Sequence, residues 1–570
     1  MSHSKKIKVL FHSNHSRLVT GFGKNTRNIM MGLHNDPDIE VIEAANGAKF
    51  GADLLTPWKS YGTHPSDAAT LQAIQGDGPK ERMAQYGFYT IDKIIEECKP
   101  DIYLGVEDIW AFTEYQNKPW WNKINKVLWT TLDSVPILDQ ALQMEPLADK
   151  MLVWASFAEK EMKRLGHKNV ETIHGAIDYT NFKPLDNRSE IRKKFGIDDS
   201  YVIGFVFKNQ LRKSVPNLLQ GFKIFKEKNA DIKCKLLLHT DWGEIGHGWD
   251  IPRYVREMGI DEKDVLSTYV CHACDFYFVS HYQGEEKNCP RCKKEKTFKT
   301  KNSNKGIGEV ELNELYNCMD VYCHPFTSGG QELPIQEAKS AGLITLVTEY
   351  SCGTDSCYEK QGGIPLKWNE YREPSTQFIK ASTCPEDIAE KLEKVYRMDD
   401  IEKLSIISSG MKHVKQSYSI NSICKKLKNV FLSLDKPKFE EKEEDKNTQN
   451  LISLDDVLDD EGPTNRIAVV LPESAGDILI LNSLMENLKS LYPEKNIYIF
   501  TKPEYYQMIE DNPAIHKLLP YNPQVENLLF LEGRGDHEGY FEMAFLPNIG
   551  TQRHLNYLHN GKDKTQFELR

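Results

Sequence analysis

The chain has 570 residues, of which 40% are hydrophobic and 27% are charged, and its formal net charge is −11. This length predicts about three domains, and the negative charge disfavours a surface that coats nucleic acid throughout. No stretch approaches the roughly 20 apolar residues of a membrane-spanning helix. The N-terminal run lacks the cleavage site of a signal peptide, so we expect a cytoplasmic protein.

Strand and helix patterns alternate over the first part of the chain. Strands are expected at residues 7–13, 101–106, 126–132 and 150–156, and helices at 25–35 and 89–98. A loop, TGFGKNT, follows the first strand and carries Gly21 and Gly23. Strands separated by helices indicate a parallel sheet that is covered on both faces.

A second series of the same kind follows. Strands are expected at 201–207, 233–240, 320–325 and 343–349, with a helix at 216–228 and a closing helix at 420–434. The chain therefore predicts an α/β fold with two consecutive Rossmann-like units, whose ligands bind at the carboxyl ends of the strands.

Residues 326–342 read FTSGGQELPIQEAKSAG and combine a glycine turn with a helix start. Gly329 and Gly330 let backbone N–H groups approach a ligand closely, and Pro334 suits the first helical position. A helix start attracts a phosphate, and Glu337, one turn further on, is placed to accept hydrogen bonds from sugar hydroxyls. The segment indicates a nucleotide-sugar site; the alternative is an ordinary glycine turn and helix cap.

Four landmarks in this order resemble the GT-B glycosyltransferases of family 4, retaining enzymes with two facing Rossmann-like domains. They are Gly21-Phe22-Gly23-Lys24, VETIHGAIDYTNFKPL (170–185), the basic pair in VFKNQLRKSVPNLLQGF (206–222), and 326–342. The resemblance implies an acceptor domain at residues 1–185 and a donor-binding domain at 186–435.

The resemblance also implies roles for individual residues. Gly21 and Gly23 would bring backbone amides against the donor diphosphate. Lys208 and Lys213 would neutralise the charge that builds on this leaving group, and the family usually has an arginine where Lys208 stands. Glu337 matches the second Glu of the E-x7-E motif and would bind the ribose. The other donor contacts would come from Gly329, Gly330, Gln331 and Leu333, and no catalytic metal is expected.

The chain departs from the family pattern at the first Glu of E-x7-E, because that position is Gly329. Either Glu332 makes part of the sugar contact and belongs to the catalytic residues, or the backbone amides of 329–331 make that contact. The departure leaves the donor sugar open, and it also admits a non-catalytic relative.

Carboxylates end two strands on the expected acceptor side, where a general base would sit. Asp108 and Asp133 are the candidates there, together with Glu107, although strand-end acids are also common helix caps. Lone histidines and tryptophans are more often packed than functional. We therefore interpret the following as core or loop residues: His12, His15, His174, Trp110, Trp120 and Trp121.

Cys271, Cys274, Cys289 and Cys292 form two CxxC pairs separated by 14 residues. Such a pattern places four thiolates around one tetrahedral ion, for which structural zinc is the default. An iron–sulfur centre and a redox dithiol pair are the alternatives. The resulting zinc ribbon, 267–305, interrupts the second Rossmann-like unit and is not a general feature of the family.

The distal part of the ribbon, residues 285–305, carries eight basic and three acidic residues with aromatic residues around it. Basic residues interleaved with aromatics can bind single strands or unstacked bases. The other interpretation is a stable insertion without a ligand of its own.

Two further segments follow the second unit. Residues 436–464 are expected to be an acidic linker in which 451–458 form a short docking helix. Residues 465–570 predict one βαβ unit and resemble the N-terminal half of a family 9 heptosyltransferase, with Gly476-Asp477 on the acceptor side. Without a donor-binding half, this partial module would serve docking, oligomerisation or acceptor presentation.

Together these patterns predict a retaining glycosyltransferase that uses a nucleotide-sugar donor. The acceptor would be a cell-envelope glycan, lipid or protein, or else a hydroxymethylated DNA base, which would have to be flipped out or single-stranded. The alternative is a non-catalytic nucleotide-sugar-binding or scaffold protein of this fold.

Overall fold

The computed structural model describes residues 6–18, 20–301, 305–434, 454–472, 474–521, 539–547 and 553–556. The chain divides into two compact units, one made of 1–52 and 61–438 and the other of 53–60 and 439–570. Most of the predicted acidic linker, 435–453, lies outside the described residues. Within the described part of the chain, no helix is both long and apolar enough to cross a membrane.

The first half of the larger unit is built on a seven-stranded sheet in the order β3-β2-β1-β4-β5-β6-β7. The strands are β1 Ile7–Asn14, β2 Ile39–Lys49, β3 Lys59–His64, β4 Ile102–Gly105, β5 Asn125–Thr130, β6 Lys150–Val153 and β7 Val170–Thr172. The helices are α1 Gly21–His34, α2 Ala68–Ile74, α3 Gly78–Gln85, α4 Ile91–Cys98, α5 Asp139–Met144 and α6 Ser156–Arg164. Strands β1, β2 and β4 to β7 pair in parallel, as predicted.

The second half contains a nine-stranded sheet whose main path is β12-β13-β10-β9-β8-β14-β15-β16, with β11 paired to β10. Its strands are β8 Tyr201–Val206, β9 Cys234–His239, β10 Val265–Cys271, β11 Tyr277–His281, β12 Glu286–Lys287, β13 Phe298–Thr300, β14 Val321–His324, β15 Thr345–Thr348 and β16 Gly363–Leu366. Strands β17 Trp368–Arg372 and β18 Ile379–Thr383 form a separate hairpin.

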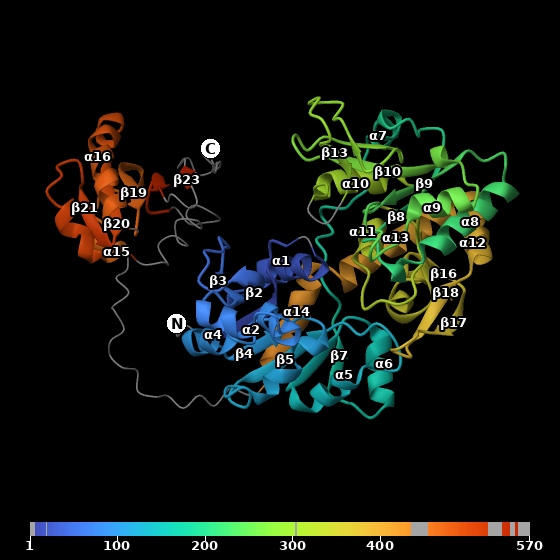
Figure 1. The fold of residues 1–570 in the computed structure, drawn as a ribbon, viewed down its shortest axis with the longest axis horizontal. Helices are drawn as coiled ribbons and strands as arrows, with labels where there is room; N and C mark the ends of the chain where they lie inside the picture. The colour runs from blue at the N-terminus through green and yellow to red at the C-terminus, as the bar shows by residue number, and fades with distance from the viewer. Residues whose placement is uncertain are drawn as a thin grey trace. The chain divides into compact units, whose positions relative to one another are not determined.

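Helices flank this second sheet (Figure 1). They are α7 Arg188–Lys194, α8 Val215–Lys228, α9 Ile251–Glu257, α10 Glu309–Cys318, α11 Leu333–Ser340, α12 Pro385–Arg397 and α13 Asp400–Ser417. The central strands read as nearly continuous apolar runs because both faces are covered, and β8, β9 and β14 are buried along almost their whole length.

Two expected elements differ from the observed ones. The loop TGFGKNT is mostly helix, because α1 begins at Gly21 and Thr20 is its N-cap, accepting the Gly23 N–H at 3.0 Å. The closing helix, α14 Ile420–Ser433, packs against α1 of the first half rather than on the second sheet (Figure 1). Gly32 permits this contact, since a Cβ there would lie 2.5 Å from Cys424 Sγ.

The smaller unit is a five-stranded sheet in the order β21-β20-β19-β22-β23. Its elements are α15 Leu454–Val457, β19 Arg466–Val470, α16 Ala475–Leu491, β20 Asn496–Thr501, β21 Lys517–Pro520, β22 Met543–Leu546 and β23 Arg553–Asn556. The predicted βαβ unit is present, with β19 and β20 parallel. Asp477 lies in the first turn of α16, where its carboxylate forms a capping box with Ser474.

Candidate functional site

The carboxylate of Glu332 is the centre of a charged cluster at the start of α11. Its oxygens form ion pairs with the Arg212 guanidinium and the Lys213 ammonium. The Nε2 atom of His324, at the end of β14, lies 3.3 Å from Glu332 Oε2. Glu332, Lys213 and His324 are all buried. The cluster therefore joins the carboxyl end of β14 to the turn that precedes α8.

Opposite charges shift the pKa values of the groups in this cluster. Burial alone would raise the pKa of Glu332, but the charges of Arg212 and Lys213 hold it well below its usual range. Burial, with repulsion from Arg212, lowers the pKa of Lys213 to about 8, and burial lowers the pKa of His324 to about 4. At neutral pH the Glu332 carboxylate thus faces two cations, and the Asp133 carboxyl also acts on Arg212.

The glycine at position 329 makes room for the Glu332 carboxylate. A Cβ on Gly329 would lie 2.8 Å from Glu332 Oε1 and 3.3 Å from an Arg212 guanidinium nitrogen. A side chain at 329 would therefore begin in the space that Glu332 fills. The Gly329 N–H donates to Ser351 Oγ at 3.0 Å, so this amide is already engaged.

Glu337 lies one turn into α11 and connects the two halves of the larger unit. Its Oε1 lies 3.6 Å from Lys24 Nζ, on the first turn of α1. Its Oε2 accepts a hydrogen bond of 2.7 Å from the Tyr316 hydroxyl. Glu337 and the glycine segment at 21–24, placed together by sequence reasoning, are thus neighbours in the structure.

Gly21 and Gly23 occupy the first turn of α1, and they differ in their surroundings. Nothing lies within 4 Å of a Cβ built on Gly21, whereas a Cβ on Gly23 would lie 2.4 Å from the Leu18 carbonyl oxygen. Gly23 is therefore required by a close backbone approach, and Gly21 leaves open space at the helix start.

The loop after β5 meets the turn before α11. A Cβ on Gly330 would lie 2.4 Å from Thr131 Cβ and 2.8 Å from Asp133 Oδ1. Burial raises the pKa of Asp133, and the charge of Arg212 opposes that rise. The Thr131 hydroxyl donates to Asp108 Oδ1 at 2.8 Å. Both predicted acceptor-side carboxylates therefore lie near the Glu332 cluster.

A buried polar network lies behind these carboxylates at the ends of β1, β2 and β4. His12 Nε2 lies 2.8 Å from Asn46 Oδ1, and the Asn46 amide donates to Glu107 at 3.2 Å. The other ring nitrogen of His12 lies 2.7 Å from the Tyr103 hydroxyl. Burial raises the pKa of Glu107 to about 8 and lowers that of His12 to about 4, so both groups are held neutral at pH 7.

The other predicted donor residues have different surroundings. Lys208 follows β8 and is exposed. The Gln331 side chain exchanges two hydrogen bonds with the backbone of Gly175, at 2.6 and 3.0 Å, and so fastens the interdomain segment. Leu333 packs in a small apolar cluster with Ile177 and Tyr418.

His174, Trp120 and Trp121 fit their packed interpretation, whereas Trp110 is half-buried with the Arg82 guanidinium 4.0 Å from its ring. His174 stacks on Tyr418 with ring centroids 4.5 Å apart and lies 2.7 Å from the Trp154 carbonyl oxygen. Trp120 and Trp121 are buried.

Sequence reasoning missed Arg212, His324 and Lys380. Arg212 adjoins Lys213, and the short 3-10 turn Leu211–Lys213 presents both side chains to Glu332. Lys380, on β18, donates to Ser134 Oγ at 2.9 Å and to Ser328 Oγ at 2.7 Å, so it joins the two halves. Adjacent basic residues were the only signal for Arg212.

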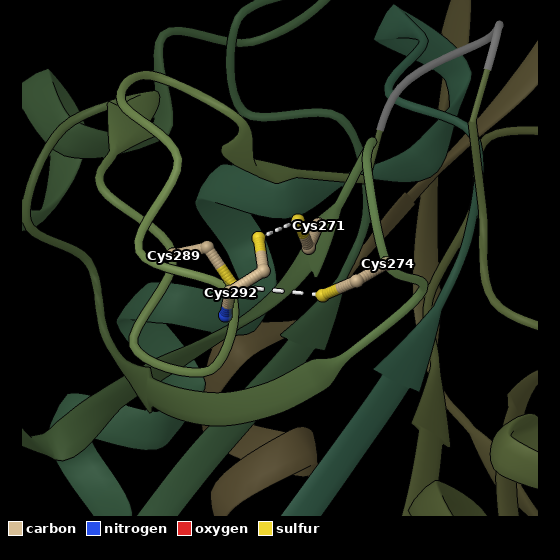
Figure 2. A group of neighbouring side chains, drawn as sticks. All are labelled: Cys271, Cys274, Cys289 and Cys292. Carbon is tan, nitrogen blue, oxygen red and sulfur yellow. Dashed lines mark hydrogen bonds between the residues drawn. The ribbon is translucent and has the colours of Figure 1, made fainter.

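The four cysteines converge as their spacing predicts. Figure 2 shows the sulfurs turned toward one another, with Cys271 and Cys292 Sγ 3.7 Å apart and Cys274 and Cys289 Sγ also 3.7 Å apart. All four Sγ atoms lie within 4.8 Å of one another. A tetrahedral ion with Zn–S bonds of about 2.3 Å needs sulfurs roughly 3.8 Å apart, whereas a disulfide needs about 2.05 Å. The donor set therefore fits zinc.

Aromatic residues of the ribbon serve its packing. Phe298 stacks on Tyr269 and on Phe276, with centroids 5.4 and 5.8 Å apart. Tyr282 stacks on Trp242 at 4.6 Å. Phe298 and Tyr277 are buried. These rings are thus engaged within the protein rather than presented as a stacking platform.

Comparison with known proteins identifies the fold of the larger unit. HepE from Anabaena, solved with UDP, matches at 12% identity and a TM-score of 0.51, covering 75% of this chain and 100% of HepE. Sucrose-phosphate synthase from Thermosynechococcus elongatus matches at 12% identity and a TM-score of 0.52. The match covers 75% of this chain and 98% of the synthase. A glycosyltransferase from Rickettsia africae matches at 11% identity and a TM-score of 0.51. This match also covers 75% of this chain and 98% of the other.

The fold is GT-B. No protein-family model matches the chain, and no curated protein matches it. The expected architecture of two facing Rossmann-like domains is thus confirmed, while at such identities the likeness extends to the fold alone.

Proposed function

We propose that this protein is a retaining glycosyltransferase of the family 4 type that uses a nucleotide-sugar donor. The observation that carries the proposal is the Glu332 cluster: a buried carboxylate with Arg212 and Lys213, in the space that a side chain at 329 would enter. HepE, which shares the fold, is described in complex with UDP and with UDP-glucose, and this supports a donor of that class.

In the proposed reaction, the donor diphosphate takes the place of Glu332 as partner of the two cations. Arg212 and Lys213 then neutralise the negative charge that builds as the sugar leaves. Glu332, released from these pairs, turns to the sugar hydroxyls, and Glu337 accepts hydrogen bonds from the ribose. The acceptor hydroxyl attacks from the face that the diphosphate leaves and gives its proton to the departing phosphate. Attack on that face retains the anomeric configuration.

The acceptor side is formed by Asp108 and Asp133, which we propose orient the attacking hydroxyl. Its source is a cell-envelope glycan, lipid or protein, or a hydroxymethylated DNA base. The packed aromatic rings of the ribbon favour the first class. Strongly salt-dependent DNA binding that is lost on deleting residues 271–305 would instead support DNA.

Two further parts complete the proposal. The ribbon holds one structural zinc ion, so elemental analysis is expected to find one zinc per chain and less in Cys289→Ser.

The smaller unit, which we relate to the acceptor half of family 9 enzymes, serves docking or oligomerisation. Its helix α16 supports this role, because it exposes four large apolar side chains by 50–73%: Leu479, Ile480, Leu484 and Leu491.

The experiment that tests the enzyme proposal is hydrolysis of UDP-, GDP-, ADP- and CMP-sugars without an acceptor. One donor is expected to turn over, and Lys213→Ala and Glu337→Ala are expected to abolish that turnover. Lys228→Ala, an exposed lysine at the far end of α8, is the matched control. If no donor in the panel is hydrolysed or bound, the enzyme proposal fails; binding without turnover supports the non-catalytic alternative.

A further inference from the structure

One residue from each of three strands meets in a short row where the parallel pairing of β9 and β10 ends. The parallel register of β9 and β10 pairs Leu238 with Ser267, so His239 comes beside Thr268 at the next position. Strand β11 occupies one edge of β10, so β9 and β13 both pair on the other edge. The antiparallel register of β10 and β13 pairs Tyr269 with Thr300, which brings Lys301 beside Thr268 where β9 ends. The Lys301 N–H donates to the Thr268 carbonyl oxygen at 3.3 Å. Directly paired residues share a face of the sheet, so these three side chains do too.

Two members of this row are buried polar groups without a partner among the described residues. His239 is 4% exposed and Thr268 is 1% exposed, and neither His239 Nδ1 nor Thr268 Oγ1 has a hydrogen-bond partner there. Buried polar groups are nearly always satisfied, because leaving one unpaired costs free energy. Their position at the carboxyl ends of parallel strands is where this fold class binds its ligands.

His239 pairs with Val206, the last residue of β8, so Lys208 follows two residues beyond the row's neighbour. Burial lowers the pKa of Lys301, and although Asp241 opposes this, the charges of Lys24 and Lys208 lower it further. Burial also lowers the pKa of His239 well below its usual range, with the charges of Lys301 and Lys24 adding to that effect. Lys24 lies 3.6 Å from Glu337. Lys24, whose charge acts on the row, is thus also paired with the residue assigned to the ribose.

The ribbon is fixed firmly enough to position Lys301. Strand β13, which precedes Lys301, is anchored by Phe298 against Tyr269 and by the cysteine cluster. At the other side of the insert, Tyr282 stacks on Trp242. A Cβ on Gly243 would lie 2.9 Å from the Glu285 carboxylate, so the insert also packs closely on the loop after β9.

We propose that the zinc ribbon is part of the donor site, and that Lys301, set beside Thr268 and His239, is a further cation for the donor's diphosphate. With Lys24 and Lys208 it adds to the Arg212 and Lys213 pair. The unpaired groups of Thr268 and His239 bind the nucleotide next to it. This inference rests on the proposed function and extends it, because it gives the insert a role in donor binding. The zinc ion would only stabilise the fold of the ribbon. Every proposed contact with the nucleotide comes from protein side chains.

The test is calorimetric binding of UDP, GDP and ADP to the full-length, zinc-loaded protein. For the tightest of the three, Lys301→Ala is expected to raise Kd about tenfold, the loss of one charge-assisted contact to phosphate. Lys294→Ala, an exposed lysine of the same ribbon, is the matched control and is expected to stay within about twofold. Zinc content is measured for every variant, so that loss of the ion is not mistaken for loss of Lys301.

A second variant separates binding from folding. Thr268→Val removes a hydroxyl that has no partner in the free protein, so the melting temperature is expected to hold while Kd rises. If Lys301→Ala or Thr268→Val binds as the wild type does, or if Lys294→Ala loses as much as Lys301→Ala, the inference is wrong and the proposed function stands. If the wild type binds none of the three nucleotides, the inference is wrong; if it also hydrolyses no donor of the panel, the proposed function falls with it.

Discussion

At the residue scale, Glu332 neutralises Arg212 and Lys213 and also fills the space beside Gly329. Glu332→Gln would keep the shape and remove the carboxylate that pairs with the buried Lys213 and the half-buried Arg212. Breaking a buried ion pair in this way costs about 3–5 kcal/mol. We therefore expect a clear fall in the thermal unfolding midpoint of the larger unit.

The control for that substitution is Glu359→Gln, which removes an exposed carboxylate paired with Lys394 at 3.0 Å. Exposed pairs contribute little to stability, so this midpoint is expected to stay unchanged. Equal midpoints for the two variants would contradict the assignment of Glu332 as the counter-charge.

The lowered pKa of Lys213 gives a pH dependence. Lys213 is protonated below about 8 and loses its charge as the pH rises through that value. Because kcat/KM reports ionisations of the free enzyme, donor hydrolysis is expected to decline above pH 8. Lys213→Arg keeps its charge at any accessible pH and is expected to move the decline upward. A decline at the same pH in both proteins would assign it to another group.

At the element scale, the start of α1 depends on one of its two glycines. Gly23→Ala would drive a Cβ to 2.4 Å from a backbone oxygen, while Gly21→Ala meets nothing within 4 Å. Overpacking of this kind costs about 1–3 kcal/mol. Thermal unfolding is therefore expected to show a lower midpoint for Gly23→Ala and no loss for Gly21→Ala. The reverse order would mean that α1 begins elsewhere.

The elements could be predicted where the local pattern decides them. Buried runs such as 201–207 and 320–325 became β8 and β14, because a strand covered on both faces is apolar throughout. The packing partner of α14 could not be predicted, because an amphipathic pattern shows which face of a helix is buried but not which element covers that face. Arg212 was missed because a 3-10 turn, rather than a regular period, aims it at Glu332.

At the scale of the whole molecule, the cysteine spacing predicted a cluster that the fold forms, because the two CxxC turns are local structures. The row of His239, Thr268 and Lys301 could not be predicted from the sequence, since it arises from the pairing registers of β9, β10 and β13. The order of the landmarks predicted the two facing sheets, while the pairing of Lys24 with Glu337 needed the folded chain.

The larger unit has its own core and contains every residue of the proposed donor site. A chain that ends at residue 438 is therefore expected to hydrolyse the donor at a rate within about threefold of the full chain, because no transition-state contact is removed. Comparison of kcat/KM for the two proteins is the measurement. A loss above about a hundredfold would place the smaller unit in the donor site.

The most direct test of the central claim is to follow donor hydrolysis by proton NMR, using the best donor of the panel. The anomeric signals of the first sugar released show whether its configuration matches that of the donor. We predict retention for the wild type and no release by Glu337→Ala or Lys213→Ala. Inversion, or release by either variant at the wild-type rate, would contradict the account.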